Sequence, residues 1–415
     1  MNQWPASPPK SPFGRFLRNA VWILALLGTA ALPIGAQESH TGDALRQKAI
    51  ELFQQNKFEE ALPLLEDLTV SRPDDSTLQE FLGGCLFAHS VGLKDPEARR
   101  QFRLRARQAF LRAKELGDHS NYLTIELSGI PEDGSESPYS TRAEVDSAMR
   151  EAEATFSRGD FAGAIAGYQQ VLKIDPSNYE AALFIGDVYF KQKDFDNSYP
   201  WFAKAIATDP NRETAYRYWG DALYGAGKDA GAEEKYVQAI VADPYKQAPW
   251  IGLLQWAQRN HVTLTQPNIQ SPNSFETNSD GSAKLTIDPN ATGKKDGSQF
   301  WMGYEMSRVL WKNQKFKQQF PNEKEYRHSL KEESDSLGMV ADSISEGLKS
   351  NEIMQENLSP QLAMLLRLKQ EGMLEPYILI SRADAGISQD YLAYRTDNRD
   401  KLLQYMHEFI LPAAK

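Results

Sequence analysis

The feature that most constrains this chain is the dipeptide Asp-Pro, which recurs at a constant spacing as Asp175-Pro176, Asp209-Pro210 and Asp243-Pro244. The residues that precede each proline recur with it, because every period contains two small residues and one aromatic residue at fixed positions. Before Pro176 these residues are Ala152, Ala164 and Tyr168. Before Pro210 they are Gly186, Ser198 and Phe202, and before Pro244 they are Gly220, Ala232 and Tyr236. A fixed period of this kind predicts a solenoid of helix pairs, in which the small residues let two helices touch.

This pattern resembles the tetratricopeptide repeat, whose units are pairs of antiparallel helices with Gly or Ala in the first helix and Ala and an aromatic residue in the second. The resemblance implies three units, at 145–178, 179–212 and 213–246. It places the turns within them at Gly159-Asp160, Lys193-Asp194 and Gly227-Lys228. Each second helix ends at a proline, which cannot continue a helix. Residues 248–260 repeat only the first-helix half and are predicted to form a capping helix.

The rest of the chain divides into regions by its residue pattern and composition. The predicted fold is all-α, a tetratricopeptide-like solenoid followed by a smaller helical C-terminal module. The expected regions are an export signal at 1–36, divergent helix-pair repeats with an insertion at 42–120, a linker at 121–144, three repeats and a capping helix at 145–260, a polar linker at 261–298, and the helical module at 299–415. Within the polar linker, a turn at 278–281 and one short strand at 283–287 are expected.

The N-terminus has the pattern of an export signal. Lys10, Arg15 and Arg18 precede an apolar run from Ala20 to Leu32, and no acidic residue occurs before Glu38. We expect cleavage before Gln37, which would change the formal net charge from -10 to -13 because three cations are lost. The expected location is extracytoplasmic, either periplasmic or secreted. The alternative is a chain that remains anchored in the membrane by an uncleaved signal.

The resemblance also implies which residues line the concave inner wall of the solenoid. They are first-helix residues, an acid and an aromatic residue three positions later in each repeat. The predicted wall residues are Glu153 and Phe156, Asp187 and Phe190, and Asp221 and Tyr224, with Arg217 four positions before Asp221. Residues three apart share a helix face, so stacked repeats would align a ladder of acids and rings suited to a cationic, partly apolar peptide. The alternative is that these side chains pack between helices and Arg217 pairs with Asp221.

The C-terminal module loses the register of the repeats but remains helical by pattern. We expect helices at 300–319 and at 323–350, the second with Leu330, Leu337 and Ile344 at heptad spacing. Such a stripe requires a partner helix. A third helix is expected to begin at Ser359-Pro360 and to end at Gly372, followed by two short helices around Tyr391 and at 402–411.

Two polar clusters in this module are candidates for chemistry. Glu325, His328 and Glu332 would share one face of the second helix, and the Glu-x-x-His spacing is half of the motif found in di-iron helical bundles. A salt-bridged helix face is the alternative interpretation. The second cluster is typical of interfaces and polysaccharide-binding surfaces, and intramolecular salt bridges explain it as well. Its members are Arg382, Asp384, Asp390, Tyr391, Tyr394, Arg395 and Asp397.

The sequence contains no Gly-rich phosphate loop, nucleophile elbow, zinc-ligand pair or Cys-His dyad, and its one thiol, Cys85, has the context of a buried apolar residue. The acidic charge disfavours nucleic acid and anionic lipid. We therefore expect a non-enzymatic scaffold with no cofactor that binds protein or peptide partners and contacts the membrane only through an uncleaved signal. The alternatives are a metal-dependent enzyme with a site near His328 and a glycan-binding envelope protein.

Overall fold

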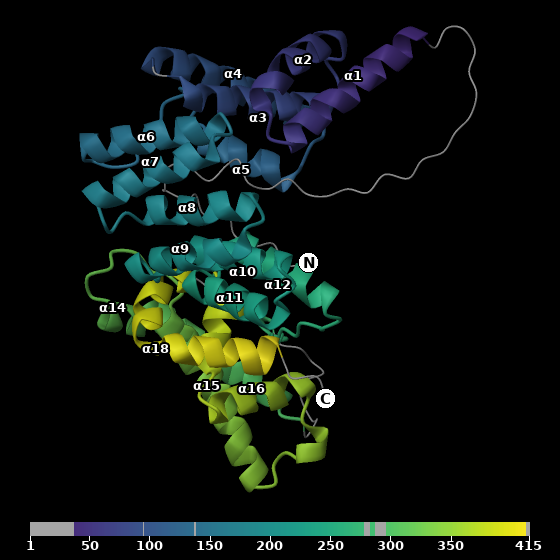
Figure 1. The fold of residues 1–415 in the computed structure, drawn as a ribbon. Coiled ribbons are helices and arrows are strands. Elements are labelled where there is room, and N and C mark those ends of the chain that lie inside the picture. The colour runs from purple at the N-terminus through teal and green to yellow at the C-terminus, as the bar shows by residue number, and fades with distance from the viewer. Residues whose placement is uncertain (1–36, 94, 137, 278–282, 287–295, 412–415) are drawn as a thin grey trace. The chain divides into compact units, whose positions relative to one another are not determined.

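The computed structural model describes residues 37–93, 95–136, 138–277, 283–286 and 296–411, so the predicted export signal lies outside the described residues. They form helices and one small antiparallel sheet (Figure 1). The all-α prediction is therefore confirmed. The chain divides into two compact units, with the boundary between Asp209 and Pro210. In the described parts of both units, no helix is long and apolar enough to cross a membrane.

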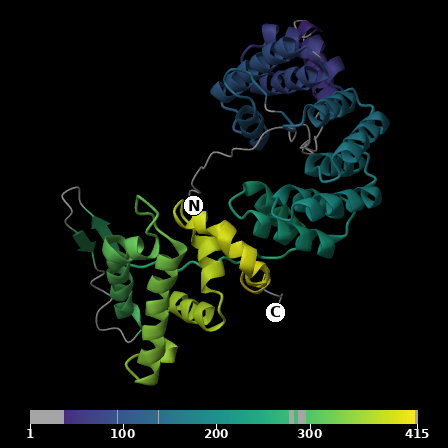
Figure 2. The same cartoon turned by 90° about the vertical axis from the view of Figure 1, so that its left-hand side faces the viewer.

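The unit that ends at Asp209, called here the N-terminal unit, is built from helix pairs joined by short turns. Its helices are α1 (Gln37–Gln54), α2 (Phe58–Ser71), α3 (Ser76–Gly92), α4 (Pro96–Glu115), α5 (Asn121–Gly129), α6 (Ala143–Ser157), α7 (Phe161–Ile174), α8 (Tyr179–Lys191) and α9 (Phe195–Thr208). The most extensive contacts join α3 to α4, α6 to α7 and α8 to α9, while α2 packs against both α1 and α3. Figure 2 shows these pairs stacked on one another.

The second unit, called here the C-terminal unit, begins with the last repeat. It contains α10 (Glu213–Gly225), α11 (Asp229–Ala242), α12 (Gln247–Arg259), β1 (Ser274–Thr277) and β2 (Ala283–Thr286). It continues with α13 (Trp301–Leu310), a π-helical turn (Trp311–Lys315), α14 (Phe316–Gln319), α15 (Leu330–Lys349), α16 (Pro360–Gln370), α17 (Leu374–Tyr377), a second π-helical turn (Ile378–Arg382), α18 (Tyr391–Tyr405) and a third π-helical turn (Met406–Ile410). The strands pair antiparallel, with Ser274 opposite Thr286.

The turns inside the repeats share one backbone conformation. Gly159, Lys193 and Gly227, the residues that the sequence placed in these turns, all have positive φ angles of 79°, 59° and 72°. His261, at the equivalent position one period later, follows α12 and has a φ of 55°. Left-handed backbone at these positions ends one helix and reverses the chain into the next segment, and glycine adopts it without steric cost.

Small residues allow the helices of a pair to approach. A Cβ atom added at Gly186 in α8 would lie 2.7 Å from the ring of Phe202 in α9, and one at Gly220 in α10 would lie 2.8 Å from the ring of Tyr236 in α11. Gly83 in α3 has the same relation, at 2.7 Å, to Phe110 in α4. The small and aromatic positions of the repeat are therefore two sides of one contact.

Three elements named here differ from the sequence-based prediction. The expected linker at 121–144 contains α5, whose first turn is capped by Ser120: its Oγ accepts a hydrogen bond from the Leu123 amide at 3.0 Å. The helix expected at 323–350 begins instead at Leu330, because Ser329 caps it and Asp390 accepts a hydrogen bond from the Leu330 amide at 2.8 Å. Strand β1 was also not predicted, whereas β2 lies where the short strand was expected.

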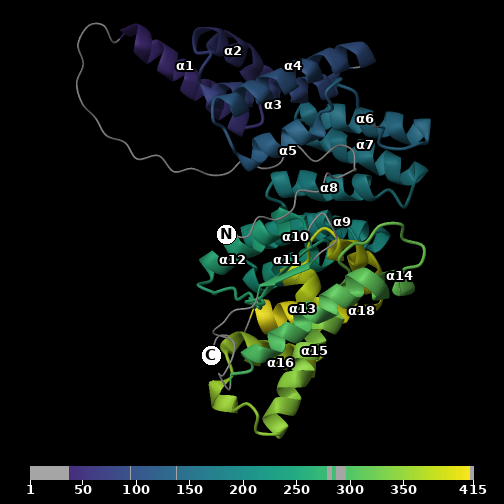
Figure 3. The same ribbon diagram turned by 180° about the vertical axis from the view of Figure 1, so that it is seen from behind.

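The stripe of Leu330, Leu337 and Ile344 is buried, as its heptad spacing predicts. The neighbours of α15 are α13 and α16, and Figure 3 shows the three helices side by side. Ser359 caps α16 and Gly372, with a φ of 71°, follows its end, both as predicted.

The contact between small residue and ring gives a direct test. We expect Gly186→Ala to destabilise the N-terminal unit by about 1–3 kcal/mol, because the added methyl group overlaps the Phe202 ring in a packed interface. Gly92→Ala is the matched control, since its added Cβ would meet nothing within 4 Å; replacing this helical glycine should leave stability unchanged or raise it by about 0.5–1 kcal/mol. Urea unfolding followed by circular dichroism measures both. Equal stability of Gly186→Ala and the wild type would contradict the packing argument.

Candidate functional site

Two of the three predicted wall acids accept a hydrogen bond from a tyrosine of their own repeat. Tyr168 of α7 donates its hydroxyl hydrogen bond to Glu153 of α6, and Tyr236 of α11 donates to Asp221 of α10 at 2.8 Å. Phe202 occupies the tyrosine position in the repeat that contains Asp187, so no hydroxyl is present there. Glu153 and Asp187 are buried and Asp221 is partly exposed. Where the ring is a tyrosine, the acid and the hydroxyl thus join the two helices of a repeat.

The predicted wall aromatics also contact neighbouring structural elements. Phe156 lies 5.7 Å from the ring of Phe161, and Phe190 lies 5.9 Å from Phe195, between ring centroids. Both contacts connect the end of a first helix to the start of the second. In the third repeat, the guanidinium of Arg259 in α12 lies 3.4 Å from the centroid of the Tyr224 ring.

Arg217 pairs within α10, as the sequence suggested. Its guanidinium lies 3.2 Å from Glu213 and 3.7 Å from Asp221, and it covers the ring of Tyr218 at 4.5 Å. Burial raises the pKa of Asp221 although Arg217 opposes this shift. The structure therefore brings Arg217 and Asp221 together and gives most wall residues contacts inside a helix pair. Phe190, Asp221 and Tyr224 remain partly exposed.

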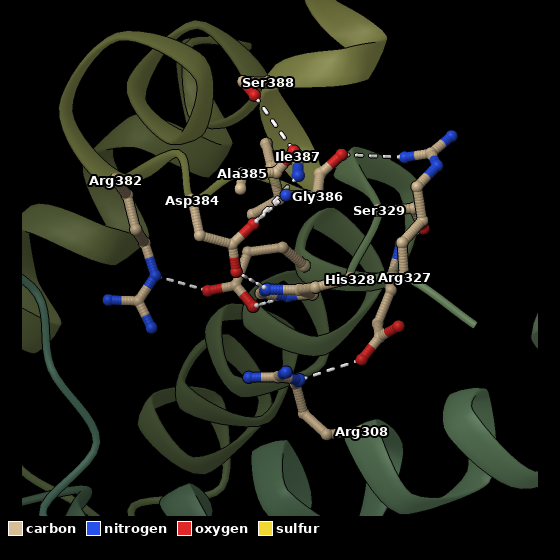
Figure 4. Close-up of polar contacts among 12 residues, drawn as sticks. Arg308, Arg327, His328, Ser329, Arg382, Asp384, Ala385, Gly386, Ile387 and Ser388 are labelled. Atoms are coloured by element: carbon tan, nitrogen blue, oxygen red, sulfur yellow. Dashed lines mark hydrogen bonds and ion pairs between the residues drawn. The ribbon is translucent and has the colours of Figure 1, made fainter. Parts of the chain in front are cut away.

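The densest polar arrangement is a buried network at the start of α15, shown in Figure 4. Two successive carboxylates, Glu332 and Glu333, are fully buried. Glu332 accepts hydrogen bonds at 2.9 Å from both Arg308 of α13 and Tyr326. Buried carboxylates are stable only when such partners satisfy them.

Glu333 has a separate set of partners. It accepts hydrogen bonds from Tyr304 of α13 at 2.9 Å and from Arg382, and it lies 3.0 Å from Nε2 of His328. The other imidazole nitrogen of His328 lies 2.7 Å from Asp384, which in turn accepts hydrogen bonds from the amides of Gly386 and Ile387. The network thus connects α13, α15 and the segment before α18.

This arrangement joins the two polar clusters that the sequence showed separately. Arg327 pairs with Asp390 at 2.7 Å, and the next residue, His328, pairs with Asp384 at the same distance. Two further members of the second cluster bind the unit's own backbone: the hydroxyl of Tyr391 donates to the carbonyl of Val241 at 2.6 Å, and Arg395 donates to the carbonyl of Ala242. Intramolecular pairing, one of the two interpretations of this cluster, accounts for these contacts.

The predicted helix face of Glu325, His328 and Glu332 is wrong. Residues 320–329 form no helix, Glu325 is exposed, and Glu332 is turned toward Arg308. Both ring nitrogens of His328 are engaged by carboxylates. Among the residues that the structure describes, no group of three or more His, Cys, Asp or Glu side chains could hold a metal ion.

The network raises the pKa of His328 and lowers the pKa of Glu333. Burial disfavours the charged imidazolium, but hydrogen bonds to Asp384 and Glu333 outweigh burial and raise the pKa of His328 to about 9. Burial also disfavours ionised Glu333, yet the hydrogen bond to His328 and the charge of Arg382 lower its pKa to about 2. Near neutral pH the pair is therefore an imidazolium and a carboxylate.

The signs of these shifts predict a pH dependence. Because the folded-state pKa of His328 exceeds the value near 6.5 of an unfolded histidine, its contribution to stability is complete below about pH 6 and is lost as pH rises through 9. We expect His328→Gln to lower stability at pH 6 and to flatten the decline between pH 6.5 and 9. Urea unfolding of the full chain across this range, followed by tryptophan fluorescence, measures the slope. His407→Gln, outside the network, is the control; an unchanged slope in His328→Gln would refute the assignment.

The fold defines a helix-pair repeat protein, in which small residues let the two helices of a pair lie close together. Residues 46–92 and 149–213 match the model of the tetratricopeptide repeat family. The chain therefore contains tetratricopeptide repeats in these two stretches, and repeats of this class act in general as non-catalytic binding scaffolds.

Several solved structures are similar to the chain at low identity. The C-terminal part of a tetratricopeptide repeat-containing protein from Cytophaga hutchinsonii is 11% identical, with a TM-score of 0.28, and the match covers 71% of this chain and 94% of that one. The first tetratricopeptide domain of Spaghetti (RPAP3), bound to an HSP90 peptide, is 20% identical over 28% of this chain and 93% of that one, with a TM-score of 0.27. The TPR2AB domain of yeast Sti1, in its pHSP90 complex, is 14% identical over 54% and 99%, with a TM-score of 0.27. No curated protein matches the chain.

Proposed function

We propose that the protein is an exported scaffold that binds protein or peptide partners through its tetratricopeptide repeats. The observation that carries this proposal is the repeated helix pair itself, which the family match identifies over residues 46–92 and 149–213. Stacked helix pairs create an extended surface from regularly spaced side chains, and such surfaces are used for binding rather than for catalysis.

We further propose that the partner is a cationic, partly apolar peptide segment. Support comes from the formal net charge of -10 and from Asp221 and Tyr224, which lie on α10 and are partly exposed. Aromatic rings beside carboxylates attract cationic side chains through both the ring face and the charge. Glu153 and Asp187 are buried, so in this proposal their main contribution is to hold the helix pairs together.

The peptide proposal is tested at Asp221. Asp221→Asn removes the charge and keeps an oxygen that can accept the hydrogen bond from Tyr236. We expect it to weaken binding of a fluorescent peptide of alternating Lys and Leu about five-fold, which corresponds to about 1 kcal/mol. Fluorescence anisotropy at low and high salt measures the affinity.

Asp67→Asn on the exposed side of α2 is the matched control, because it makes the same chemical change on a second helix. It should bind the peptide as the wild type does. If Asp221→Asn retains wild-type affinity and the same salt dependence, Asp221 is a packing residue and the peptide proposal fails.

Export is supported by the sequence of residues 1–36. We expect the mature protein in its native host to begin at Gln37 and to be recovered from the extracytoplasmic fraction, because a cationic segment followed by a short apolar run is recognised by the export machinery. N-terminal sequencing and intact mass measure the cleavage. A chain with Arg15→Glu and Arg18→Glu should accumulate uncleaved. Recovery of the full-length wild-type chain in the cytoplasm would contradict export.

A further inference from the structure

The first two helix pairs, α1–α2 and α3–α4, keep the register of the later repeats. Phe53 of α1 corresponds to Phe156 of α6, because each ring contacts the phenylalanine five residues later, at 5.4 and 5.7 Å between centroids. Gly83 of α3 corresponds to Gly220 of α10, because both face an aromatic ring of the paired helix. Phe53 therefore stands at the position of the wall aromatics, and Gly84, the residue after Gly83, stands at the position of the wall acids.

Helix α5 covers both of these wall positions. The ring of Tyr122 lies 6.1 Å from the ring of Phe53, between centroids. The hydroxyl oxygen of Tyr122 lies 2.5 Å from the point that a Cβ atom on Gly84 would occupy. Glycine at this position, where the later repeats have an acid, thus lets α5 lie directly on α3. In this part of the chain the wall is occupied by a segment of the chain itself.

A second contact ties the start of α5 to α3. The hydroxyl of Ser120 donates a hydrogen bond to Glu80 of α3 and accepts one from the Leu123 amide at 3.0 Å. Glu80 precedes Gly83 by three residues, as Arg217 precedes the small residue of its own repeat. One serine therefore caps α5 and attaches it to the helix that it covers.

One side chain of α5 opposes this packing. Glu126 is 1% exposed, and neither of its carboxyl oxygens has a hydrogen-bond partner among the described residues. Burial of a carboxylate without partners is strongly unfavourable. Burial, together with the charge of Glu80, raises the pKa of Glu126 well above its ordinary value, so this carboxyl is protonated while α5 is in place.

Glu80 is the second buried carboxyl of this contact. Burial raises the pKa of Glu80 to about 7; the hydrogen bond from Ser120 opposes this shift, and the neighbouring Asp118 adds to it. Both carboxyls thus hold a proton in the packed state at pH values where an unfolded glutamate, with a pKa near 4.5, has lost it.

The other side chains around the two carboxyls are aromatic or neutral. They are the rings of Phe53 and Phe110 from α1 and α4, the Tyr122 hydroxyl from α5 and the Cys85 thiol from α3. Burial raises the pKa of the phenol and of the thiol, and Glu59 of α2 adds to the shift of the thiol. Among the described residues, the charged group that acts on Glu126 is Glu80, so ionisation of one carboxyl disfavours ionisation of the other.

We propose that α5 is an internal cover of the wall of the first two helix pairs, and that it leaves this wall when Glu80 and Glu126 lose their protons. With α5 displaced, both carboxylates are hydrated, which is the state that deprotonation favours. The uncovered wall exposes an aromatic ring, Phe53, and a carboxylate, Glu80, the combination that Tyr224 and Asp221 present on α10. The use of this wall by a partner rests on the proposed function, whereas the opening of α5 does not.

Hydrogen exchange of the full chain tests the opening directly. Mass spectrometry gives the protection of the backbone amides of residues 121–129, corrected for the intrinsic exchange rate at each pH. Because opening releases protons, the packed state of α5 loses stability as pH rises above 4.5. Between about pH 5.5 and about pH 7.5 we expect protection to fall at least about thirty-fold, since each released proton contributes up to about ten-fold per pH unit. Protection of α7, in the same unit, should stay constant.

Variants assign the effect to the two carboxyls. Glu80→Gln keeps an acceptor for Ser120, and Glu126→Gln removes the charge that α5 cannot bury. Each variant should flatten the decline in protection, and the double variant should abolish it. Glu60→Gln is the matched control, because it makes the same change at an exposed acid on α2 and should decline as the wild type does.

Three results would overturn the cover: protection of α5 that is independent of pH, a decline that persists in the double variant, or equal loss of protection in α7, which would indicate unfolding of the whole unit. The fluorescent Lys and Leu peptide tests the use of the wall in an Asp221→Asn background. We expect tighter binding at about pH 7.5 than at about pH 5.5, and no such gain in the double carboxyl variant. Opening of α5 without a gain in binding would contradict the proposed function at this wall and leave the cover established.

Discussion

The rest of the repeat structure depends on the contact between a small residue of one helix and an aromatic ring of the next. At Gly186 and Gly220 the ring occupies the space of an absent side chain, so the two backbones lie close together. This close approach brings Asp221 within hydrogen-bonding distance of Tyr236 and makes a tight reversal necessary after Gly227. The small residue and the ring recur together because they form the two sides of this contact.

The tyrosine hydroxyls explain two of the three acids that recur on the first helices. A hydroxyl that is carried into the interior with its ring needs an acceptor, and a carboxylate on the facing helix supplies it. Glu153 with Tyr168 and Asp221 with Tyr236 are two instances of this pairing. An acid paired in this way therefore stabilises the helix pair. It can bind a partner only if part of its side chain is also exposed to solvent. On this criterion Asp221 is the member of the ladder best placed to bind.

Sequence reasoning predicted the repeats well because their information is local and periodic. The residues of the small-residue contact, the turns at Gly159, Lys193 and Gly227, and the stripe of α15 follow from spacing alone. The start of α15 was missed, although Ser329 and Glu332 form a recognisable capping pair, because the charged residues before Ser329 continue a helical pattern. The buried network was not predictable in its pairings, since His328 meets Asp384 and Arg382 meets Glu333 only after distant segments pack. Composition identified most of these residues as polar clusters but could not say which pairs would be buried.

The buried network also determines which side of α13 faces the core of the C-terminal unit and which side faces solvent. Helix α13 has Tyr304 and Arg308 on the side that meets Glu333 and Glu332, and Met306 on the side that meets solvent. Apolar packing alone tolerates a small rotation of a helix, whereas ion pairs with two buried carboxylates tolerate little, because each has a fixed direction. The network therefore holds α13 in one orientation, because a rotation of the helix would leave two buried carboxylates without their partners.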